Sequence, residues 1–487
     1  MRPGLSVAEC VRRLKRYHYA FRRLHQIFTS RIPAEPIYEL KMVFSLHAYL
    51  CAEHVAALRQ RVSEMREPPL GLEVVPDAGL EVLFDEVLAA PTTAELVAGL
   101  YEKAVPTLRA AMERHLVETN LLADQPTVRL CRFALMELGQ MEDYGAQAVA
   151  SLVTPEARAG MADWLGLLDD CLRGAGGLEG QAEVGRAAAE AAPRADPGQA
   201  EVGRAAVAAP RADHRLPGMA DGALPVVVRQ HSAQPYRFDP VPRRDERFPD
   251  PYNMGVNAEA FLYDESYPPA AKALMMYYKR LREIDVPEVM AAIIAETPGK
   301  DWPYYRDMSR QLWDEARHAL MGEVGFAHLG LDWRQVMINF TWSLGLNTQL
   351  SALDRHGVLY FIEQGLMPKT GKRYEWEVAA ASGNPLSRLF QDYDWADEVL
   401  HARIGRDWYT SEFKTYREAV DHGDRCWSKV LIDWGAWREQ GLTAHRNWWP
   451  DLYRAACARW GMAPDPRVVD FHETYENKRA DLKTVSG

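Results

Sequence analysis

Two copies of one short motif stand in the second half of the chain. The segment WDEARH carries Glu315 and His318, and the segment WADEVLH carries Glu398 and His401, so that each motif has the pattern Asp-Glu-x-x-His. Residues three apart lie on one face of an α-helix, where a carboxylate and an imidazole can reach the same metal ion. Two such helices facing each other, with one glutamate from each of two further helices, would surround a pair of metals.

The doubled motif is a more specific signal than either copy alone. Histidine makes up 14 of the 487 residues, and five Asp-Glu pairs occur in the chain, of which two are followed by x-x-His. A single such pair is usually a solvated polar pair, whereas two pairs on long helices of the same half indicate a shared site. A mixed set of carboxylates and imidazoles suits iron or manganese better than zinc or calcium.

The two remaining glutamates are expected on the helix that precedes each motif. Glu363 lies 35 residues before Glu398, and Glu283 lies 32 residues before Glu315, so the spacing nearly repeats. Glu288 is the alternative to Glu283, because it lies on the more apolar stripe of the same helix. We favour Glu283 on its height in the antiparallel helix pair, although the proline between the two glutamates is expected to kink the helix.

Other acidic and histidine residues are interpreted as structural. His356 lies two turns before Glu363 on the same face, and it is either an extra ligand, a proton shuttle or, as we favour, a structural histidine. In the first half, no Glu-x-x-His pattern joins the candidates His47, Glu53, His54, His115, Glu137 and Glu142. A second metal site is therefore not predicted there.

Apolar residues recur with a period near 3.6 along most of the chain, which predicts an all-α fold. In the second half, the helices that would position the motifs are predicted at 269–296, 304–329, 333–365 and 385–412. In the first half, four helices are predicted at 7–29, 35–66, 93–120 and 126–153. No pattern typical of strands competes with these helices.

Composition divides the chain into five regions. A tandem copy rich in Ala, Pro and Gly (GQAEVGRAAAEAAPRAD followed by PGQAEVGRAAVAAPRAD) cannot bury enough apolar surface to order itself, which predicts a linker. The predicted regions are an N-terminal helical bundle at 1–173, this linker at 174–222, a proline-rich extended arm at 223–268, the metal-binding four-helix bundle at 269–412, and a helical, tryptophan-rich tail at 413–487.

Charge and cysteine content narrow the class of protein. The formal net charge of −11 and the pI near 5.8 argue against a general phosphate-binding surface and hence against nucleic acid as a partner. No membrane span or export signal is expected, because arginines interrupt the N-terminal segment. The six cysteines are widely spaced without a CxxC pair, which predicts a cytoplasmic protein without a disulfide framework or a zinc knuckle.

Residues 275–412 resemble the ferritin-like di-iron carboxylate superfamily, most closely an uncharacterised bacterial ferritin-like family related to the tRNA hydroxylase branch. The similar segments are REIDVPEVM, YRDMSRQLWDEARH, EQGL and DYDWADEVLHARIGRDWY. The first half is only weakly similar to a ferritin-like bundle without ligands. The resemblance implies metal ligands at Glu283, Glu315, His318, Glu363, Glu398 and His401. It also implies that Asp314 and Asp397 each hold the ligand histidine of the opposite helix, which fixes its tautomer.

The resemblance implies a non-haem di-iron oxidoreductase, an oxygenase or oxidase that uses O2 on a small organic substrate. Two iron ions are expected, with manganese as the alternative, and Glu315 and Glu398 are the expected bridging ligands. Electrons would come from the substrate or from a reductase, because no G-x-G-x-x-G motif is present. The other interpretations are a ferritin-like iron-binding protein or ferroxidase and an RNA-modifying hydroxylase. An oligomer is compatible with each of them.

Two positions depart from better-known branches of the superfamily. Gly322 stands one turn after His318, where radical-storing enzymes carry a tyrosine, and Met367 stands one turn after Glu363, where hydrocarbon monooxygenases carry a threonine. The first departure argues against a stored tyrosyl radical. The second argues against oxygen gating of the monooxygenase type.

Overall fold

The computed structural model describes residues 3–65, 70–180, 235–368, 371–430 and 432–475. All regular secondary structure in these ranges is helical, apart from one isolated antiparallel bridge between Val256 and Thr474. The all-α class is therefore confirmed. Among the described helices, none has the length and apolarity needed to span a bilayer. Most of the predicted linker lies outside the described residues.

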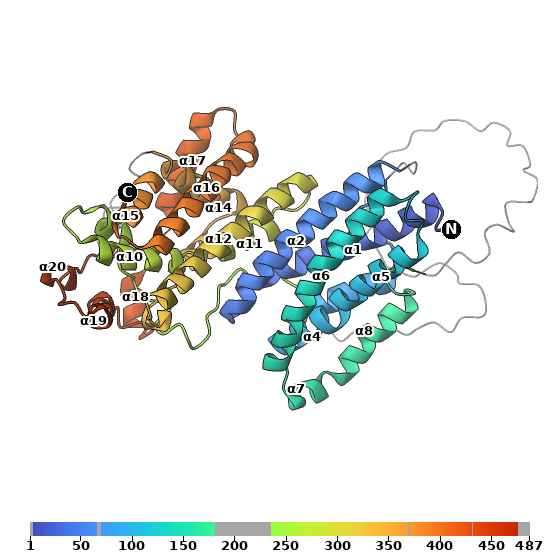
Figure 1. Ribbon diagram of the computed structural model, residues 1–487, viewed down its shortest axis with the longest axis horizontal. Coiled ribbons are helices and arrows are strands. Elements are labelled where there is room, and N and C mark those ends of the chain that lie inside the picture. The colour runs from blue at the N-terminus through green and yellow to red at the C-terminus, as the bar shows by residue number, and fades with distance from the viewer. Residues whose placement is uncertain (1–2, 66–69, 181–234, 369–370, 431, 476–487) are drawn as a thin grey trace, which may run out of the picture.

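The first half begins with a long helical hairpin and continues with shorter helices (Figure 1). Its helices are α1 (Val7–Arg31), α2 (Tyr38–Ser63), α3 (Ala78–Leu88), α4 (Thr93–Ala98), α5 (Val105–Glu118), α6 (Gln125–Leu152), α7 (Pro155–Gly160) and α8 (Ala162–Gly174). A π-helical segment, Gly99–Ala104, joins α4 to α5, so the single helix predicted at 93–120 is divided. The Ser6 side chain accepts a hydrogen bond from the backbone N–H of Glu9 and caps α1.

The second half contains the helices that carry the predicted ligands. They are α9 (Ala258–Tyr263), α10 (Pro269–Arg282), α11 (Asp285–Ala295), α12 (Trp302–His328), α13 (Thr341–Gln349), α14 (Ala352–Gly365), α15 (Lys372–Ala381) and α16 (Pro385–Trp408). The predicted helical tail follows as α17 (Tyr416–Lys429), α18 (Trp434–Glu439), α19 (Trp449–Trp460) and α20 (Pro466–Val469). Short 3-10 segments, Trp333–Gln335 and Thr410–Glu412, lie in the connections.

Two predicted helices of the second half are also broken in the structure. The helix expected at 269–296 breaks at Glu283 and Ile284, close to Pro287, whose ring removes a backbone donor. The helix expected at 333–365 breaks after α13, and the Ser351 side chain caps α14 by accepting from the backbone N–H of Asp354. Helices also form outside the predicted helical segments, in α3, α7 and α8 of the first half, in α9 at the end of the extended arm and in α15.

The two halves pack directly against each other. Helix α2 lies along α12, and the two helices are side by side at the centre of the molecule in Figure 1. The indole N–H of Trp302 donates to the carbonyl of Ala52 at 3.0 Å, and His25 Nε2 lies 2.7 Å from Ser309 Oγ. One apolar cluster contains buried residues from both halves. The first half therefore helps to hold α12 in place, and α12 carries Glu315 and His318.

Close contact between α10 and α12 sets the position of Glu283. A Cβ atom at Gly322 of α12 would lie 2.2 Å from the backbone nitrogen of Leu281, and one at Gly325 would lie 2.1 Å from the ring of Tyr277. Glycine at these two positions lets the helix backbones approach each other. The end of α10, and with it Glu283, is thereby brought next to His318.

Candidate metal centre

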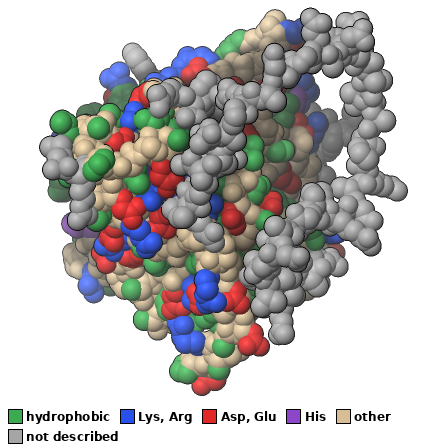
Figure 2. All heavy atoms as spheres, turned by 90° about the vertical axis from the view of Figure 1, so that its right-hand side faces the viewer, with side chains coloured by type: hydrophobic (Ala, Val, Ile, Leu, Met, Phe, Trp, Pro, Cys, Tyr) green, Lys and Arg blue, Asp and Glu red, His purple; other side chains and the backbone are tan. Residues whose placement is uncertain are grey.

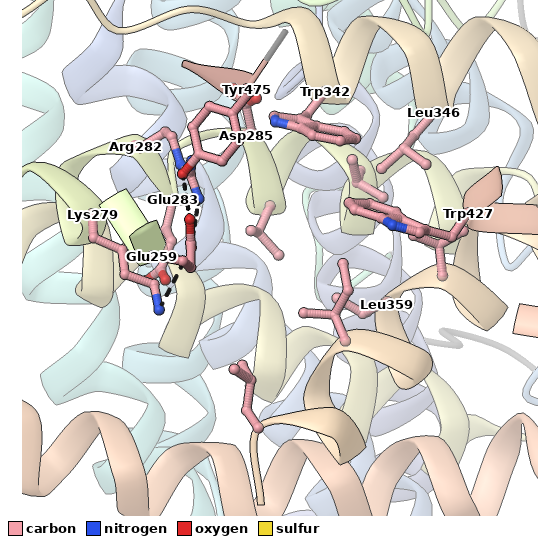
Figure 3. A pocket seen from close by; sticks show the side chains of 15 residues that line it. Glu259, Lys279, Arg282, Glu283, Asp285, Trp342, Leu346, Leu359, Trp427 and Tyr475 are labelled. Atoms are coloured by element: carbon pink, nitrogen blue, oxygen red, sulfur yellow. Dashed lines mark hydrogen bonds and ion pairs between the residues drawn. The ribbon is translucent and has the colours of Figure 1, made fainter. Parts of the chain in front are cut away.

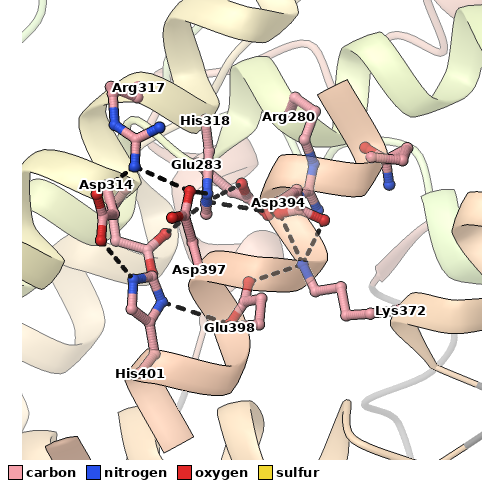
Figure 4. Close-up of polar contacts among 12 residues, drawn as sticks. Arg280, Glu283, Asp314, Arg317, His318, Lys372, Asp394, Asp397, Glu398 and His401 are labelled. Atoms are coloured by element: carbon pink, nitrogen blue, oxygen red, sulfur yellow. Dashed lines mark hydrogen bonds and ion pairs between the residues drawn. The ribbon is translucent and has the colours of Figure 1, made fainter. Parts of the chain in front are cut away.

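The structure brings the predicted ligands into one interior cluster. Helices α12 and α16 face each other with their Glu-x-x-His pairs directed inward, while the junction of α10 and α11 and the last turn of α14 each contribute one glutamate. Figure 4 shows Glu283, His318, Glu398 and His401 of this cluster. The clustered residues are Glu283, Glu315, His318, Glu363, Glu398 and His401. Five of them are buried, and the side chain of Glu283 is 15% exposed.

One part of the cluster surrounds His401, and we call Glu315, Glu363, Glu398 and His401 the His401 group. The Nδ1 atom of His401 lies 3.1 Å from Glu315 Oε1 and 3.5 Å from Glu398 Oε2. It lies 3.8 Å from Glu363 Oε1. One imidazole nitrogen therefore faces three carboxylates from three different helices.

The other part surrounds His318, and we call Glu283, His318 and Asp394 the His318 group. The Nδ1 atom of His318 lies 3.5 Å from Glu283 Oε2 and 3.6 Å from Asp394 Oδ1. It is also 3.6 Å from Glu315 Oε2. Since Glu315 presents one oxygen to each histidine, it lies between the two groups.

The outer nitrogen of each histidine contacts an aspartate on the opposite helix. His318 Nε2 lies 3.2 Å from Asp397 Oδ2, and His401 Nε2 lies 3.4 Å from Asp314 Oδ2. A carboxylate only accepts hydrogen bonds, so each contact favours the tautomer with its proton on Nε2. The lone pair on Nδ1 then faces the carboxylates, as a metal-ligating imidazole requires. Arg317 donates to both aspartates and ties α12 to α16.

Several inward-facing atoms have no hydrogen-bond partner among the described residues. They are Glu283 Oε2, Glu315 Oε1, His318 Nδ1, Glu398 Oε2 and His401 Nδ1. Unpaired polar atoms in an interior are costly unless something satisfies them. All five are carboxylate oxygen or imidazole nitrogen atoms, which ligate iron and manganese through their lone pairs. The residues present therefore fit a pair of such ions.

The charges in the cluster favour a cation. Burial alone would lower the pKa of His401, but the carboxylates around it raise the pKa well above its ordinary value, and the pKa of His318 is raised in the same way. Burial and the neighbouring Glu398 raise the pKa of Glu363 well above its ordinary range. For Glu315, the two imidazoles overcome the effect of burial and lower the pKa to about 2. Positive charge is therefore stabilised between these carboxylates.

Three residues in the cluster were not predicted from the sequence. Asp394 joins the His318 group and accepts hydrogen bonds from Arg280 and, at 3.0 Å, from Lys372. The Lys372 amine also lies 2.7 Å from Glu398 Oε1, and Arg280 lies 2.7 Å from Glu283 Oε1. The signal for Asp394 was its place four residues before Glu398 on the same helical face. Lys372 had no such signal, because its segment was interpreted as a connection.

The two alternative residues lie outside the cluster. Glu288 is fully buried, forms ion pairs with Lys41 at 2.7 Å and with Arg244, and accepts a hydrogen bond from Ser343 Oγ. His356 is buried as well, and burial lowers its pKa to about 4, which keeps it neutral. Neither residue belongs to the groups of possible metal ligands.

A cavity of about 530 Å³ opens beside the cluster (Figure 3). Glu283 lines it on one side together with other charged residues of α9 and α10, and the opposite side is apolar. Trp342 of α13 and Trp427 of α17 stack there with their rings 4.6 Å apart. The remaining apolar lining is Val286, Val289, Leu346, Val358, Leu359, Ile362 and Leu366. Because Glu283 belongs to both, the cavity reaches the candidate metal centre.

No family model, curated protein or solved structure matches this chain. The geometry of the site is therefore the basis on which its function can be argued.

Proposed function

We propose that the protein is a ferritin-like, non-haem di-iron oxidoreductase that uses O2 to oxidise a small organic substrate. The observation that carries the proposal is the pair of histidine Nδ1 atoms, each facing carboxylates from several helices while an aspartate holds the other ring nitrogen. Glu315 presents one oxygen to each histidine, as expected of a bridging ligand. Two iron ions bound there would supply the binding and reduction of O2.

The chain's own residues would hold and orient such a centre. Asp397 and Asp314 keep the protons of His318 and His401 on their outer nitrogens, and Arg317 fixes both aspartates. Lys372 occupies one oxygen of Glu398 and leaves the other directed inward. Arg280 likewise pairs with Oε1 of Glu283 and leaves Oε2 directed inward. The free oxygen of each glutamate is thereby oriented before any ion binds.

The cavity supports an enzyme over an iron-storage protein. A ferroxidase needs a path for ions, whereas this cavity combines a polar wall at Glu283 with an apolar wall that contains two stacked tryptophans. Cavities of this size and composition are typical of small-molecule sites. Its polar side would place a substrate next to the metal centre, and its apolar side would exclude water from the reacting part.

An RNA-modifying hydroxylase is less well supported. A nucleic-acid surface gathers lysine and arginine on one face. On the end of the molecule formed by the first half, acidic and basic side chains are mixed (Figure 2). Together with the net charge of −11, this favours a small substrate over a polynucleotide.

The experiment is metal and oxygen analysis of the full chain. Protein loaded anaerobically with ferrous iron should bind about two ions per chain and change its near-ultraviolet and visible absorption when O2 is added. Glu398→Ala should lose iron and the O2-dependent absorption. Glu377→Ala, a matched change at a half-exposed glutamate of α15 that pairs with Arg373, should change neither.

Two outcomes would contradict the proposal. Iron bound equally well by Glu398→Ala would place the metal elsewhere. Accumulation of many ferric ions per chain, without oxidation of any organic compound, would instead identify an iron-storage ferroxidase.

A further inference from the structure

A second group of possible ligands lies where α17 packs on α14. Asp354 comes from the first turn of α14, and His422 and Cys426 are one turn apart on α17. His422 Nε2 lies 3.0 Å from Asp354 Oδ1, and Cys426 Sγ lies 3.3 Å from the same oxygen and 3.6 Å from His422 Nε2. We call these three residues the Asp354 group. No spacing in the sequence indicated this group, because the aspartate and the histidine are far apart in the chain.

Contact between the two helices fixes this arrangement. A Cβ atom at Gly423 would lie 2.5 Å from the carbonyl oxygen of Gly357, so only glycine lets α17 approach α14 this closely. The thiol of Cys426 is fully buried, while the side chains of Asp354 and His422 are 26% and 20% exposed. The group is therefore open to solvent on the side opposite the thiol.

The hydrogen bonds of Tyr409 determine which nitrogen of His422 carries the proton. The Tyr409 hydroxyl donates to the carbonyl of Ala419 at 2.8 Å, so it accepts at its 2.9 Å contact with His422 Nδ1. The Nδ1 atom must then be protonated, and in the neutral ring Nε2 carries a lone pair. That lone pair faces a carboxylate oxygen of Asp354 at 3.0 Å. A bound cation, or a proton shared between them, brings two such atoms to this distance.

The geometry points to a binding site for one divalent cation that prefers sulfur and nitrogen ligands, such as zinc. A tetrahedral zinc ion with Zn–N and Zn–O bonds of about 2.0 Å and a Zn–S bond of about 2.3 Å has ligand-to-ligand edges of roughly 3.3–3.6 Å. The three distances in the Asp354 group, 3.0, 3.3 and 3.6 Å, are close to one face of such a tetrahedron. Water would complete the fourth position on the exposed side.

Binding of the cation would replace the thiol proton of Cys426. In its absence the thiol donates to Asp354, and burial together with that carboxylate raises the pKa of Cys426 to about 12. The thiolate is the form that ligates zinc, so the proton is released to solvent as the metal binds. The contact of His422 with Tyr409 then acts as the outer support that metal-ligating histidines commonly have.

The site would control one wall of the cavity. Trp427 follows Cys426 directly and stacks on Trp342 at the apolar side. A cation that joins α17 to α14 through these three ligands would hold that stacked pair in place. This role is structural, and the site does not depend on whether the centre at Glu315 binds iron.

Cobalt(II) is the probe that separates this site from the other. Thiolate-bound cobalt gives a strong charge-transfer band in the near ultraviolet, and the His401 and His318 groups contain no sulfur. The full chain, stripped of metal with a chelator and titrated with cobalt, should develop this band with an intensity that corresponds to one thiolate-bound ion per chain. Excess zinc should abolish it. A fully cobalt-loaded chain without the band would overturn the inference.

Variants assign the band to its residue. Cys426→Ser should lose it, whereas Cys457→Ser, a matched change at a buried cysteine that is in no group of possible ligands among the described residues, should keep it. Tyr409→Phe should keep the band but weaken cobalt binding by roughly 10–100-fold, because the outer support of His422 is lost. A band that persists in Cys426→Ser, or cobalt affinity unchanged in Tyr409→Phe, would contradict the site as assigned. Thermal unfolding of each variant checks that the fold is retained.

Discussion

The His401 and His318 groups are built from the same motif and differ at one corresponding position. Four residues before the motif glutamate, α12 carries Gln311 and α16 carries Asp394. Gln311 donates to Glu363 Oε1 at 3.2 Å and adds no charge. Asp394 adds a carboxylate, but Arg280 and Lys372 both bind it. Repetition of a motif therefore gives two similar corners of the site with different electrostatic surroundings.

Because of this difference, two bound ions would not be equivalent. In the His318 group, both Glu283 and Asp394 already have cationic partners, so an incoming metal ion gains less there. In the His401 group, only Glu398 has such a partner. We expect the His401 group to bind its ion more tightly.

The largest effect is expected at Glu315, which serves both groups. Glu315→Ala should remove both ions, because each histidine then loses one of its facing carboxylates. Metal content after gel filtration measures the effect. A variant that still holds two ions with parental affinity would show that Glu315 is not a shared ligand.

The next effect separates the two groups. His318→Gln should retain about one ion per chain, whereas His401→Gln should retain clearly less than one, because the tighter position is lost. Titration of the native chain with a chelator should likewise remove the ions in two steps. Equal losses in the two variants, or a single step, would mean that the charges of Arg280 and Lys372 do not distinguish the groups.

A smaller effect is expected from substitutions of Asp394 and Gln311, which occupy the corresponding position at which the two groups differ. Asp394→Asn should weaken only the less tightly bound ion, by roughly 10–100-fold, as is typical when a supporting carboxylate is removed from a metal site. Gln311→Asn serves as the matched change on α12 and should leave that ion unaffected. Isothermal titration with ferrous or manganous ion measures both affinities. Weakening of both ions in Asp394→Asn would argue against two separable positions.

Glu288→Gln is expected to leave metal binding unchanged and to lower the free energy of unfolding. Glu288→Gln leaves Lys41 without its buried carboxylate and Arg244 with Asp285 alone, and breaking a buried pair costs about 3–5 kcal/mol of unfolding free energy. Glu283→Gln should show the reverse, with reduced metal content and a smaller change in stability. Denaturant unfolding and metal analysis of the two variants measure this. Loss of metal from Glu288→Gln alone would restore Glu288 as the ligand.

The sequence predicted the part of the site that depends on helical spacing. Glu315, His318, Glu398 and His401 followed from a repeated three-residue interval, and Glu283, favoured on helix height, lies near them in the structure, whereas Glu288 does not. The all-α class followed from periodicity in the same way. Whether these residues bind metal stays a prediction.

Features that depend on tertiary packing could not be predicted in this way. Arg280 and Lys372 reach the cluster from α10 and α15, and no spacing rule connects them to the motifs. The helix break near Pro287 was predicted only as a kink and the break near Ser351 was not predicted, because apolar periodicity continues across both. The Asp354 group depends on how closely α17 approaches α14. Gly423 and Gly357 allow this approach, but glycines alone do not predict it.

The packing of α2 along α12 has a consequence for biosynthesis. The contact between Ala52 and Trp302 joins residues 250 positions apart. At translation rates of about 5–20 residues per second, α12 leaves the ribosome roughly 12–50 seconds after α2. During that interval the side of α2 that later meets α12 has no partner from its own chain. The newly made first half would have to be shielded by a chaperone or tolerate this exposed surface, and the metal centre would be completed only after α16 has been made.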